Sequence, residues 1–364
     1  MNSLLICGSR GYPARYGGFE TLTQELANLL ILRGFKVVVT GFSSDLHENS
    51  EENVAGVLCV NVRYRGWFRL ANIISTFKAT RIAVKRTRVT GAIVLNDINF
   101  LTAFYLKYKY KVPVIMHLDG DESIRRGIPW PGKLLHKIMR RLSLEFIDKV
   151  VIDSKELIST IKTRHTHKIT VIKYAPMEVS KNHETFDSYL DYAPKDFFLN
   201  IARIVPENNV AEIAQAYLSS KRTIPLLIIG KGTGSKKYEK KIEKYVRESD
   251  GNIHFFESEY DPNKIIALMQ NCSLYIHGHE AGGTNPIVVT ARKYAVRLAS
   301  HENRFNIEGS RPDEIFWNSP LQLMKIMDGY SSILPEVNIA VKVSSIEDSW
   351  EQIVTQYCGV LFSE

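Results

Sequence analysis

The fold is decided by residues 4–40, which read LLICGSRGYPARYGGFETLTQELANLLILRGFKVVVT. Residues 4–7 have the unbroken apolar character of a buried strand, and a loop with several glycines follows them. Residues 20–33 carry leucines at helical spacing until Gly34, and residues 37–40 are again apolar and β-branched. A strand, a loop, a helix and a strand in this order predict a right-handed parallel crossover.

The same alternation recurs along the chain. In the first half it predicts strands at 92–95, 114–117, 149–152 and 169–172, with helices at 100–110, 133–146 and 155–163. In the second half it predicts strands at 197–201, 226–229, 253–255 and 274–276, with helices at 210–219, 236–248 and 262–271. The fold class that we expect is therefore α/β, with two Rossmann-like domains facing each other across a cleft.

A polar stretch at residues 178–194 separates the two series and is typical of a linker. We therefore expect one domain at residues 1–176 and a second at residues 177–340. The last segment, residues 341–364, contains an amphipathic pattern at 346–362. We expect this C-terminal helix to cross back and pack on the first domain.

Length and composition fit an ordinary globular protein. The 364 residues exceed what one hydrophobic core usually supports, and 45% of them are apolar while 24% are charged. No apolar stretch approaches the ~20 residues that cross a bilayer, and the N-terminal residues lack the features of a secretory signal, so we expect a cytoplasmic protein. The cysteines have no Cys-x-x-Cys spacing, which favours free thiols over disulfides or zinc ligands: Cys7, Cys59, Cys272 and Cys358.

The formal net charge of +8 is concentrated in the first half of the chain. Basic residues gather at 63–69, 78–88, 107–111 and 125–141, where aromatic residues are interleaved with them. This composition fits a surface that binds an anionic membrane, although a solvated helix face fits equally well. Nucleic acid is not an expected partner, because no reading motif accompanies the basic residues.

The first loop offers a candidate anion site. Gly17 and Gly18 stand at the entrance of the first predicted helix, where backbone N–H groups and the helix dipole favour a negative charge. A turn that merely needs glycine dihedral angles is the alternative. The Gly-x-Gly-x-x-Gly spacing of a dinucleotide site is absent.

A dense group of ionisable residues follows the strand at 114–117 and reads HLDGDE at 117–122. Asp119 can orient or deprotonate an acceptor hydroxyl, and His117 can polarise a sugar. Metal binding and simple solvation of Asp121 and Glu122 compete with this interpretation. Asp153 follows the next strand and can equally belong to a helix N-cap.

The second half carries three further loops with polar residues. Arg203 follows the strand at 197–201 and can pair with phosphate oxygens, while Lys231 lies in a Gly-Lys-Gly loop that is not a Walker motif. Residues 277–286 read HGHEAGGTNP and open a helix, which predicts a second diphosphate cradle. A metal pair of His277 and His279 is the less favoured interpretation.

Five motifs in fixed order carry a family resemblance: RGYPARYGGFE at 10–20, DGDE at 119–122, RIVPENN at 203–209, HGHEAGGTNP at 277–286 and HENRFN at 301–306. Together they resemble the rhamnosyltransferase-type branch of the family 4 glycosyltransferases. The resemblance implies a GT-B fold with an acceptor-binding first domain and a nucleotide-sugar-binding second domain. It also implies a retaining hexosyl transfer that requires neither a metal nor another cofactor.

Members of this branch transfer L-rhamnose from dTDP-rhamnose to a lipid-linked saccharide in the synthesis of surface polysaccharide, such as O-antigen or capsule. The partners implied are that nucleotide sugar or a similar one, the lipid-linked acceptor, and the anionic inner face of the plasma membrane. The resemblance implies a peripheral protein at that face.

The resemblance also implies roles for individual residues. The catalytic residues implied are Asp119, Asp153, Arg203 and Glu207. The donor-binding residues implied are Gly17, Gly18, Arg203, Glu207, Lys231, Glu280, Gly283, Thr284 and Asn285. The acceptor-binding residues implied are Tyr16, Phe19, His117, Glu122 and Arg125.

Two segments depart from the family pattern. The pattern GTNPSLLEAM is GTNPIVVTAR at 283–292, so Thr290 stands where a glutamate would accept hydrogen bonds from the donor ribose. The pattern DGLEWKR is DGDESIR at 119–125. These departures favour an alternative in which the chain is a catalytically impaired GT-B scaffold that assists another transferase.

Overall fold

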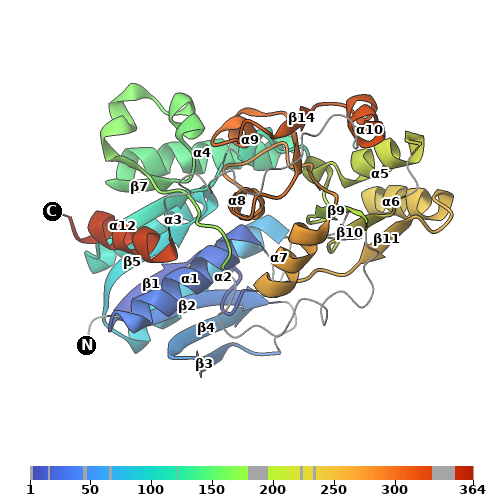
Figure 1. Cartoon of the computed structure of the whole chain (residues 1–364). Coiled ribbons are helices and arrows are strands. Elements are labelled where there is room, and N and C mark those ends of the chain that lie inside the picture. The colour runs from blue at the N-terminus through green and yellow to red at the C-terminus, as the bar shows by residue number, and fades with distance from the viewer. Residues whose placement is uncertain are drawn as a thin grey trace. The chain divides into compact units, whose positions relative to one another are not determined.

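Contacts between residues divide the chain into two units, and Figure 1 colours the chain by residue number. The first unit contains Met1–Ile124, Ile128–Tyr174 and Asp348–Glu364, and the second contains Arg125–Gly127 and Ala175–Glu347. The computed structural model describes residues 3–14, 17–43, 47–64, 68–120, 122–178, 196–221, 224–232, 235–329 and 349–363, with the backbone alone at 68–71 and 123. The predicted linker at 178–194 lies outside this part of the chain except for Glu178.

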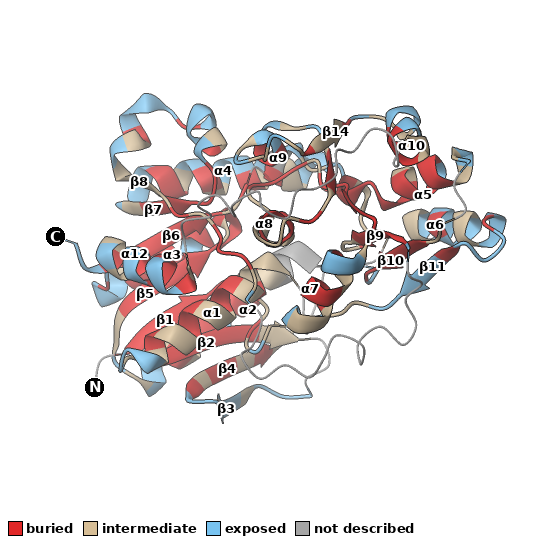
Figure 2. Ribbon diagram, in the orientation of Figure 1, coloured by how far each residue is buried: buried red, intermediate tan, exposed pale blue. Residues whose placement is uncertain are grey.

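The first unit is built on an eight-stranded sheet in the order β3-β4-β2-β1-β5-β6-β7-β8. Its strands are β1 (Ser3–Cys7), β2 (Lys36–Ser43), β3 (Ser50–Val54), β4 (Val57–Arg63), β5 (Val89–Leu95), β6 (Val114–Leu118), β7 (Lys149–Ile152) and β8 (Ile169–Val171). All neighbouring strands pair in parallel except β3, which runs antiparallel to β4. Every residue of β1 is buried, and Figure 2 shows the central strands in red. Burial on both faces is expected of a parallel sheet that helices cover.

Helices cover both faces of this sheet. They are α1 (Gly18–Leu32), α2 (Phe68–Arg86), α3 (Phe100–Tyr110), α4 (Trp130–Phe146) and α12 (Trp350–Phe362). The chain crosses from β1 to β2 in one direction and from β5 to β6 and β7 in the other, so right-handed crossovers place α1 on one face and α3 and α4 on the opposite face. Helix α12 contacts α1, while α2 contacts α3 and α3 contacts α4.

Helix α1 shows why the first crossover forms. Leu22, Leu26 and Leu30 recur every four residues and are buried on one face. The helix ends where Gly34 takes a φ of 85°, and the N–H of Phe35 donates to the carbonyl of Leu30 at 3.0 Å. Glycine adopts this left-handed conformation without strain, which makes it a common helix terminator.

The second unit holds a six-stranded sheet in the order β11-β10-β9-β12-β13-β14. Its strands, all paired in parallel, are β9 (Phe198–Ile201), β10 (Leu226–Ile229), β11 (Ile253–Phe256), β12 (Leu274–His277), β13 (Leu298–His301) and β14 (Ile315–Trp317). Its helices are α5 (Val210–Ser219), α6 (Lys236–Glu248), α7 (Pro262–Asn271), α8 (Pro286–Lys293), α9 (Arg304–Ile307) and α10 (Pro320–Asp328).

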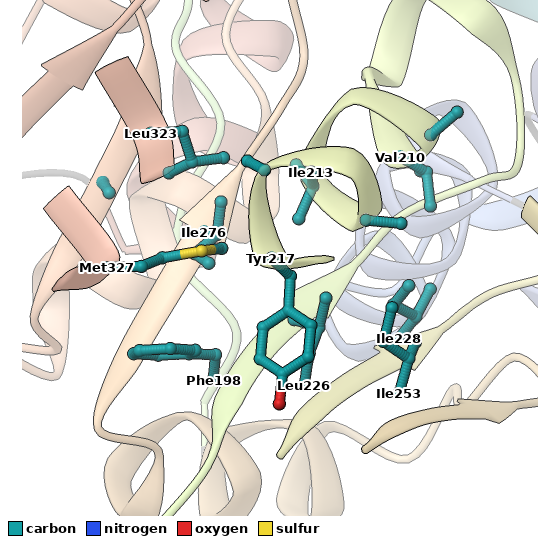
Figure 3. Packing of buried hydrophobic residues seen from close by; sticks show 14 of the residues in the cluster. Phe198, Val210, Ile213, Tyr217, Leu226, Ile228, Ile253, Ile276, Leu323 and Met327 are labelled. Atoms are coloured by element: carbon teal, nitrogen blue, oxygen red, sulfur yellow. The ribbon is translucent and has the colours of Figure 1, made fainter. Parts of the chain in front are cut away.

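One core of the second unit lies between this sheet and α5 and α10. Phe198 and Ile276 of the sheet pack with Tyr217 of α5 and with Leu323 and Met327 of α10 (Figure 3). Fully burying a side chain of this size stabilises a protein by about 1.5–3 kcal/mol. The core holds β9 and β12 side by side and thereby fixes the loops that follow them.

One predicted element is wrong. The helix expected at 155–163 is replaced by two 3₁₀ turns, Lys155–Thr160 and Thr163–Lys168. The hydroxyl of Ser159 donates to the carbonyl of Glu156, and that of Thr160 donates to the carbonyl of Leu157, at 2.8 Å and 2.7 Å. Such local side-chain bonds compete for the carbonyls that an α-helix would use.

Two sequence predictions concern the cysteines and membrane-spanning helices. All four cysteines are free, as predicted, and burial raises the pKa of Cys7 to about 12 and that of Cys59 to about 11. Within the described ranges, no helix combines the length and the apolar character that crossing a bilayer requires.

Candidate active site

Both sheets have a topological switch point, where crossovers leave in opposite directions. In the first unit it lies between β1 and β5, and in the second between β9 and β12. Open α/β sheets bind ligands beyond the carboxyl ends of the strands at such points. The loops that carry the sequence motifs at 8–20, 202–209 and 278–285 follow β1, β9 and β12.

In the first unit, the loop after β1 is tied to the helix that follows it. The N–H of Arg10 donates to Glu20 and that of Ala14 donates to Gln24, both at 2.9 Å. Tyr12 Oη donates to Asn28 at 2.7 Å. Because residues 20, 24 and 28 share one face of α1, the loop lies along the helix.

The start of α1 has no side-chain cap in the part of the chain that the structure describes. Gly17 is the N-cap residue, with an extended φ of −172°. A Cβ atom at Gly17 would approach a Glu20 oxygen at 3.6 Å, which is an ordinary contact. Glycine dihedral angles are therefore not what this position requires, and the anion site remains a prediction. Tyr16 lies outside the described residues.

His117 is the centre of a buried group in the first unit. Its Nδ1 atom shares a hydrogen bond with the Tyr357 hydroxyl of α12, and the Phe19 ring lies edge-on with centroids 5.9 Å apart. Burial lowers the pKa of His117 to about 4, against the charge of Asp119, so the imidazole is neutral at physiological pH. In the described part of the chain, its Nε2 atom has no hydrogen-bond partner and can bond to a ligand.

The two predicted aspartates lie near this histidine. Asp119 follows β6 and Asp153 follows β7, and both charges add to the burial that raises the pKa values of Tyr174 and Tyr357. Asp153 is fully buried. The cap of the next turn is supplied by Ser154, whose hydroxyl accepts from the N–H of Glu156 at 3.1 Å. Ser154 thus takes the capping role that the sequence offered for Asp153.

A hydrogen bond from Arg140 of α4 fixes the loop that carries Asp119. Gly120 has a φ of 65°, and its carbonyl accepts from Arg140 of α4 at 2.6 Å. Arg140 and Glu122 are both buried. A buried guanidinium bonded to the loop backbone fixes the position of the neighbouring carboxylate.

In the second unit, the loops after β9 and β12 touch. A Cβ atom on Gly278 would lie 2.1 Å from the Asn208 carbonyl oxygen, so only glycine allows this approach. His279 Nδ1 and Asn208 Oδ1 are 2.7 Å apart, and the N–H of Glu280 donates to the carbonyl of Glu207 at 3.0 Å. These bonds bring together the RIVPENN and HGHEAGGTNP motifs.

Glu207 and Glu280 differ in whether their carboxylate oxygens are paired. Arg126 forms a bidentate ion pair with Glu280 and also donates to Asn209 at 2.8 Å. Glu207 is 7% exposed, and its Oε2 atom has no hydrogen-bond partner among the described residues. Glu207 is therefore the carboxylate that is available to a ligand hydroxyl.

Arginines surround His279. Burial lowers the pKa of His279, and the charges of Arg125 and Arg203 lower it further. Arg125 also lies within 3.4 Å of the Cβ position of Gly282. The structure thus groups Arg125, predicted as an acceptor residue, with the loop that is predicted to bind the donor. Lys231 is exposed, and its backbone carbonyl accepts from the N–H of Ile204 at 3.0 Å.

Helix α8 begins at the predicted cradle. Asn285 is its N-cap and accepts from the N–H of Ile287 at 3.2 Å, while Gly283 is buried and Thr284 precedes the cap. The Thr290 hydroxyl donates to the carbonyl of Pro286 at 2.9 Å and accepts from the N–H of Met177 at 3.0 Å. The proton and one lone pair of this buried hydroxyl are thus used within the fold.

Comparisons with known proteins agree with this geometry. Residues 182–293 match the family model "Glycosyl transferases group 1", and residues 1–176 match "Domain of unknown function (DUF1972)". The chain contains a group 1 glycosyltransferase domain. No curated protein matches the chain.

Solved structures resemble the group 1 domain together with the rest of the chain. Sucrose-phosphate synthase from Thermosynechococcus elongatus has a TM-score of 0.77 at 12% identity, covering 99% of this chain and 98% of that one. Anabaena HepE in complex with UDP and glucose has a TM-score of 0.73 at 13% identity, covering 100% and 99%. The trehalose 6-phosphate synthase from Burkholderia multivorans has a TM-score of 0.68 at 12% identity, covering 99% and 98%. This likeness confirms the GT-B fold of two Rossmann-like domains.

Three residues that contact the candidate site were not predicted from the sequence. Tyr357 belongs to the amphipathic pattern of the C-terminal helix and is expected only to pack. Tyr174 and Arg140 stand outside any motif. Their signal is spatial, because each is buried against the loop or ring that it contacts.

Proposed function

We propose that this protein transfers a sugar from a nucleoside diphosphate donor, and that the donor binds where the loops after β9 and β12 meet. The observation that carries the proposal is the juxtaposition of Arg203 and Glu207 with the His279–Asn285 loop at the switch point of the second sheet. The match of residues 182–293 to group 1 glycosyltransferases supports it.

The chemistry of these residues suits a leaving diphosphate. Arg203 and the N-terminus of α8 offset the negative charge that develops as the glycosidic bond breaks. The open oxygen of Glu207 accepts hydrogen bonds from sugar hydroxyls. We propose that these groups suffice without a metal ion and that the transfer is of the retaining type. Activity that is lost on adding EDTA and restored by magnesium would contradict the first part.

We further propose that the first unit binds the acceptor. Phe19 and Asp119 lie near His117 at the carboxyl end of β6, and Glu122 is in the turn that follows; there Asp119 orients or activates the acceptor hydroxyl. Neutral His117 offers its Nε2 atom as a hydrogen-bonding group for substrate.

The finer identity of the substrates rests on the family resemblance of the five motifs. We propose L-rhamnose from dTDP-rhamnose as the donor sugar and a lipid-linked saccharide as the acceptor, in the synthesis of O-antigen or capsule. The protein then works in the cytoplasm, peripherally at the inner face of the plasma membrane.

One observation favours a second candidate function. The Thr290 hydroxyl makes two hydrogen bonds within the fold, and Glu280 is already paired with Arg126. A chain that cannot hold the donor ribose would act as a scaffold for another transferase.

A donor panel separates the two candidates. The purified protein is incubated with a lipid-linked saccharide and with dTDP-rhamnose, UDP-glucose or a GDP-sugar, and the glycolipid is analysed by mass spectrometry. We expect one donor to extend the acceptor by one hexose residue. A protein that extends no acceptor with any donor, but stimulates a partner transferase, would be the scaffold.

A further inference from the structure

A groove of about 750 Å³ runs between α2 and α3 on the surface of the first unit. Its walls are apolar along most of its length: Ile73, Ile74, Phe77, Leu101, Phe104 and Tyr105 line it. Ile74 is 65% exposed, and the rings of Phe77 and Tyr105 pack with centroids 4.9 Å apart. The volume lies within the ~300–1,000 Å³ of small-molecule sites.

Helix α2 buries mostly small residues. Its buried residues are Ile73, which is 9% exposed, and five small ones: Ser75, Thr76, Ala79, Thr80 and Ala83. The larger Ile74, Phe77 and Ile82 are exposed or half-buried and line the groove. A helix normally buries its largest apolar side chains, so the place of these three in the groove favours a surface that a partner covers.

The groove is cationic at one end. Lys78, Arg81, Lys85 and Lys109 also line it, and none of the four forms an ion pair with a side chain that the structure describes. Lys109 lies over the Tyr105 ring, with Nζ 5.5 Å from the centroid. Helix dipoles account for Lys85 and Lys109 in the last turns of their helices, but not for Lys78 and Arg81 in mid-helix.

The direction of the groove follows from the topology. Helix α2 runs down to the amino end of β5, and α3 starts from its carboxyl end. Ile73 and Leu101, near the helix starts, therefore lie toward the carboxyl edge of the sheet, while Lys85 and Lys109 lie toward the amino edge. An anionic amphiphile fits with its charged group at the amino edge and its chain directed toward the carboxyl edge.

The same character continues over α4, which contacts α3. Trp130, Leu134 and Ile138 are 75%, 48% and 45% exposed on this helix. Lys137 and Arg141 are exposed beside them. Aromatic, aliphatic and basic side chains on one surface are the composition of a membrane-interface surface.

We propose that the α2–α3 groove binds one anionic phospholipid of the bilayer, with its phosphate at Arg81, Lys85 and Lys109 and one acyl chain along the apolar walls. A lipid-linked acceptor fits less well, because its phosphates have to reach Asp119 at the carboxyl edge, where the groove is apolar. This inference goes beyond the proposed transfer, and its test needs neither donor nor acceptor.

The direct test uses the whole protein with isoleucine methyl groups labelled for NMR. Ile73, Ile74 and Ile82 line the groove and report on it. Titration with monomeric dihexanoyl phosphatidylglycerol is expected to shift these three signals in a saturable way. Glycerol phosphate should leave them unchanged, and dihexanoyl phosphatidylcholine should bind at least about fivefold more weakly, since each well-placed cation contributes about that factor. Unmoved signals would overturn the proposal, as would shifts produced by a lipid-linked saccharide but not by phosphatidylglycerol.

A matched pair of variants tests the groove in the bilayer setting. Ile74→Glu places a charge in the groove, whereas Leu32→Glu makes the same change at a residue of α1 that is 80% exposed on the opposite face. Binding to phosphatidylglycerol vesicles should fall at least about tenfold more for Ile74→Glu, because a carboxylate there repels the lipid phosphate and is costly to desolvate. Equal losses in the two variants would mean that net charge alone governs binding and would refute the groove.

The same vesicle assay tests whether binding depends on the basic residues of the groove in particular. Arg81→Glu should weaken vesicle binding strongly, whereas Lys240→Glu, which makes the same reversal on α6 of the second unit, should not. Both residues are exposed, so the variants should fold, which their thermal unfolding midpoints will verify. Equal effects of the two reversals would contradict the assigned site.

Discussion

At the scale of single residues, Asp119 stands at the end of β6 beside neutral His117. Asp119→Asn keeps size and hydrogen bonding but removes charge and basicity. We expect turnover to fall by about 10²-fold or more, with donor affinity nearly unchanged, because a general base or electrostatic stabiliser is lost. Steady-state kinetics and donor titration measure the two quantities. Near-wild-type turnover would exclude a catalytic role, and an equal loss of donor binding would make the residue structural.

Glu207 offers the matching test on the donor side. Its carboxylate has an open oxygen while its backbone carbonyl ties the two loops, so Glu207→Gln should leave the loops intact. We expect donor affinity to fall by about tenfold or more, since a charge-assisted bond to a sugar hydroxyl contributes about 1.5–3 kcal/mol. Glu257→Gln, at an exposed position after β11, is the control. Isothermal titration calorimetry measures the donor affinity of each variant. Identical affinities in both variants would remove Glu207 from the site.

At the scale of elements, α12 connects the C-terminal end of the chain to the buried group around His117 in the first unit. Tyr357→Phe keeps the buried ring and removes the hydroxyl that bonds to His117. We expect the free energy of unfolding to fall by about 1–3 kcal/mol, because a buried imidazole nitrogen loses its partner. Turnover should fall with it, as His117 is no longer oriented. Tyr260→Phe at an exposed position is the control for both measurements. If stability and turnover are unaffected, α12 only packs.

The elements that the sequence predicts well are those whose large apolar residues face the core. β1 and α1 belong to this class, because Leu22, Leu26 and Leu30 mark one buried face. Helix α2 escapes prediction, since its buried face consists mostly of small residues such as Ser75, Ala79 and Thr80. Strand β3 escapes for a related reason, because it is an exposed edge strand without an apolar alternation.

The candidate site is predictable where chemistry is concentrated in one motif. The RIVPENN and HGHEAGGTNP loops are such motifs, and the structure brings them together through Asn208 and His279. Long-range partners are not predictable in this way. Tyr357 reaches His117 across 240 positions, and Arg126 reaches Glu280 across 154. Only the fold creates these contacts.

At the scale of the whole molecule, buried histidines make stability depend on pH. Burial lowers the pKa of His117 from 6.5 to about 4 and that of His277 from 6.5 to about 3. The unfolded chain therefore binds more protons than the native one below pH 6.5, so the stabilisation is complete above 6.5 and is lost as the pH falls toward 4. His117 alone accounts for about 3 kcal/mol over this interval.

Denaturant unfolding at several pH values across this interval measures the effect. His277→Gln should flatten the dependence, while His254→Gln, at an exposed position, should not. A free energy of unfolding that stays constant from neutral pH down to the folded pKa values would show that these imidazoles are not held neutral.

The central claim, that the molecule transfers a sugar from a nucleoside diphosphate donor, is tested most directly by acceptor-dependent release of the nucleoside diphosphate. The wild-type protein and the Glu207→Gln variant are incubated with dTDP-rhamnose, with and without a lipid-linked saccharide, and the released dTDP is quantified. We expect rapid release only when wild-type protein, donor and acceptor are all present, and strongly reduced release by the variant. Equal release by wild type and variant, or none from any nucleotide sugar of the panel, would contradict a transfer at this site.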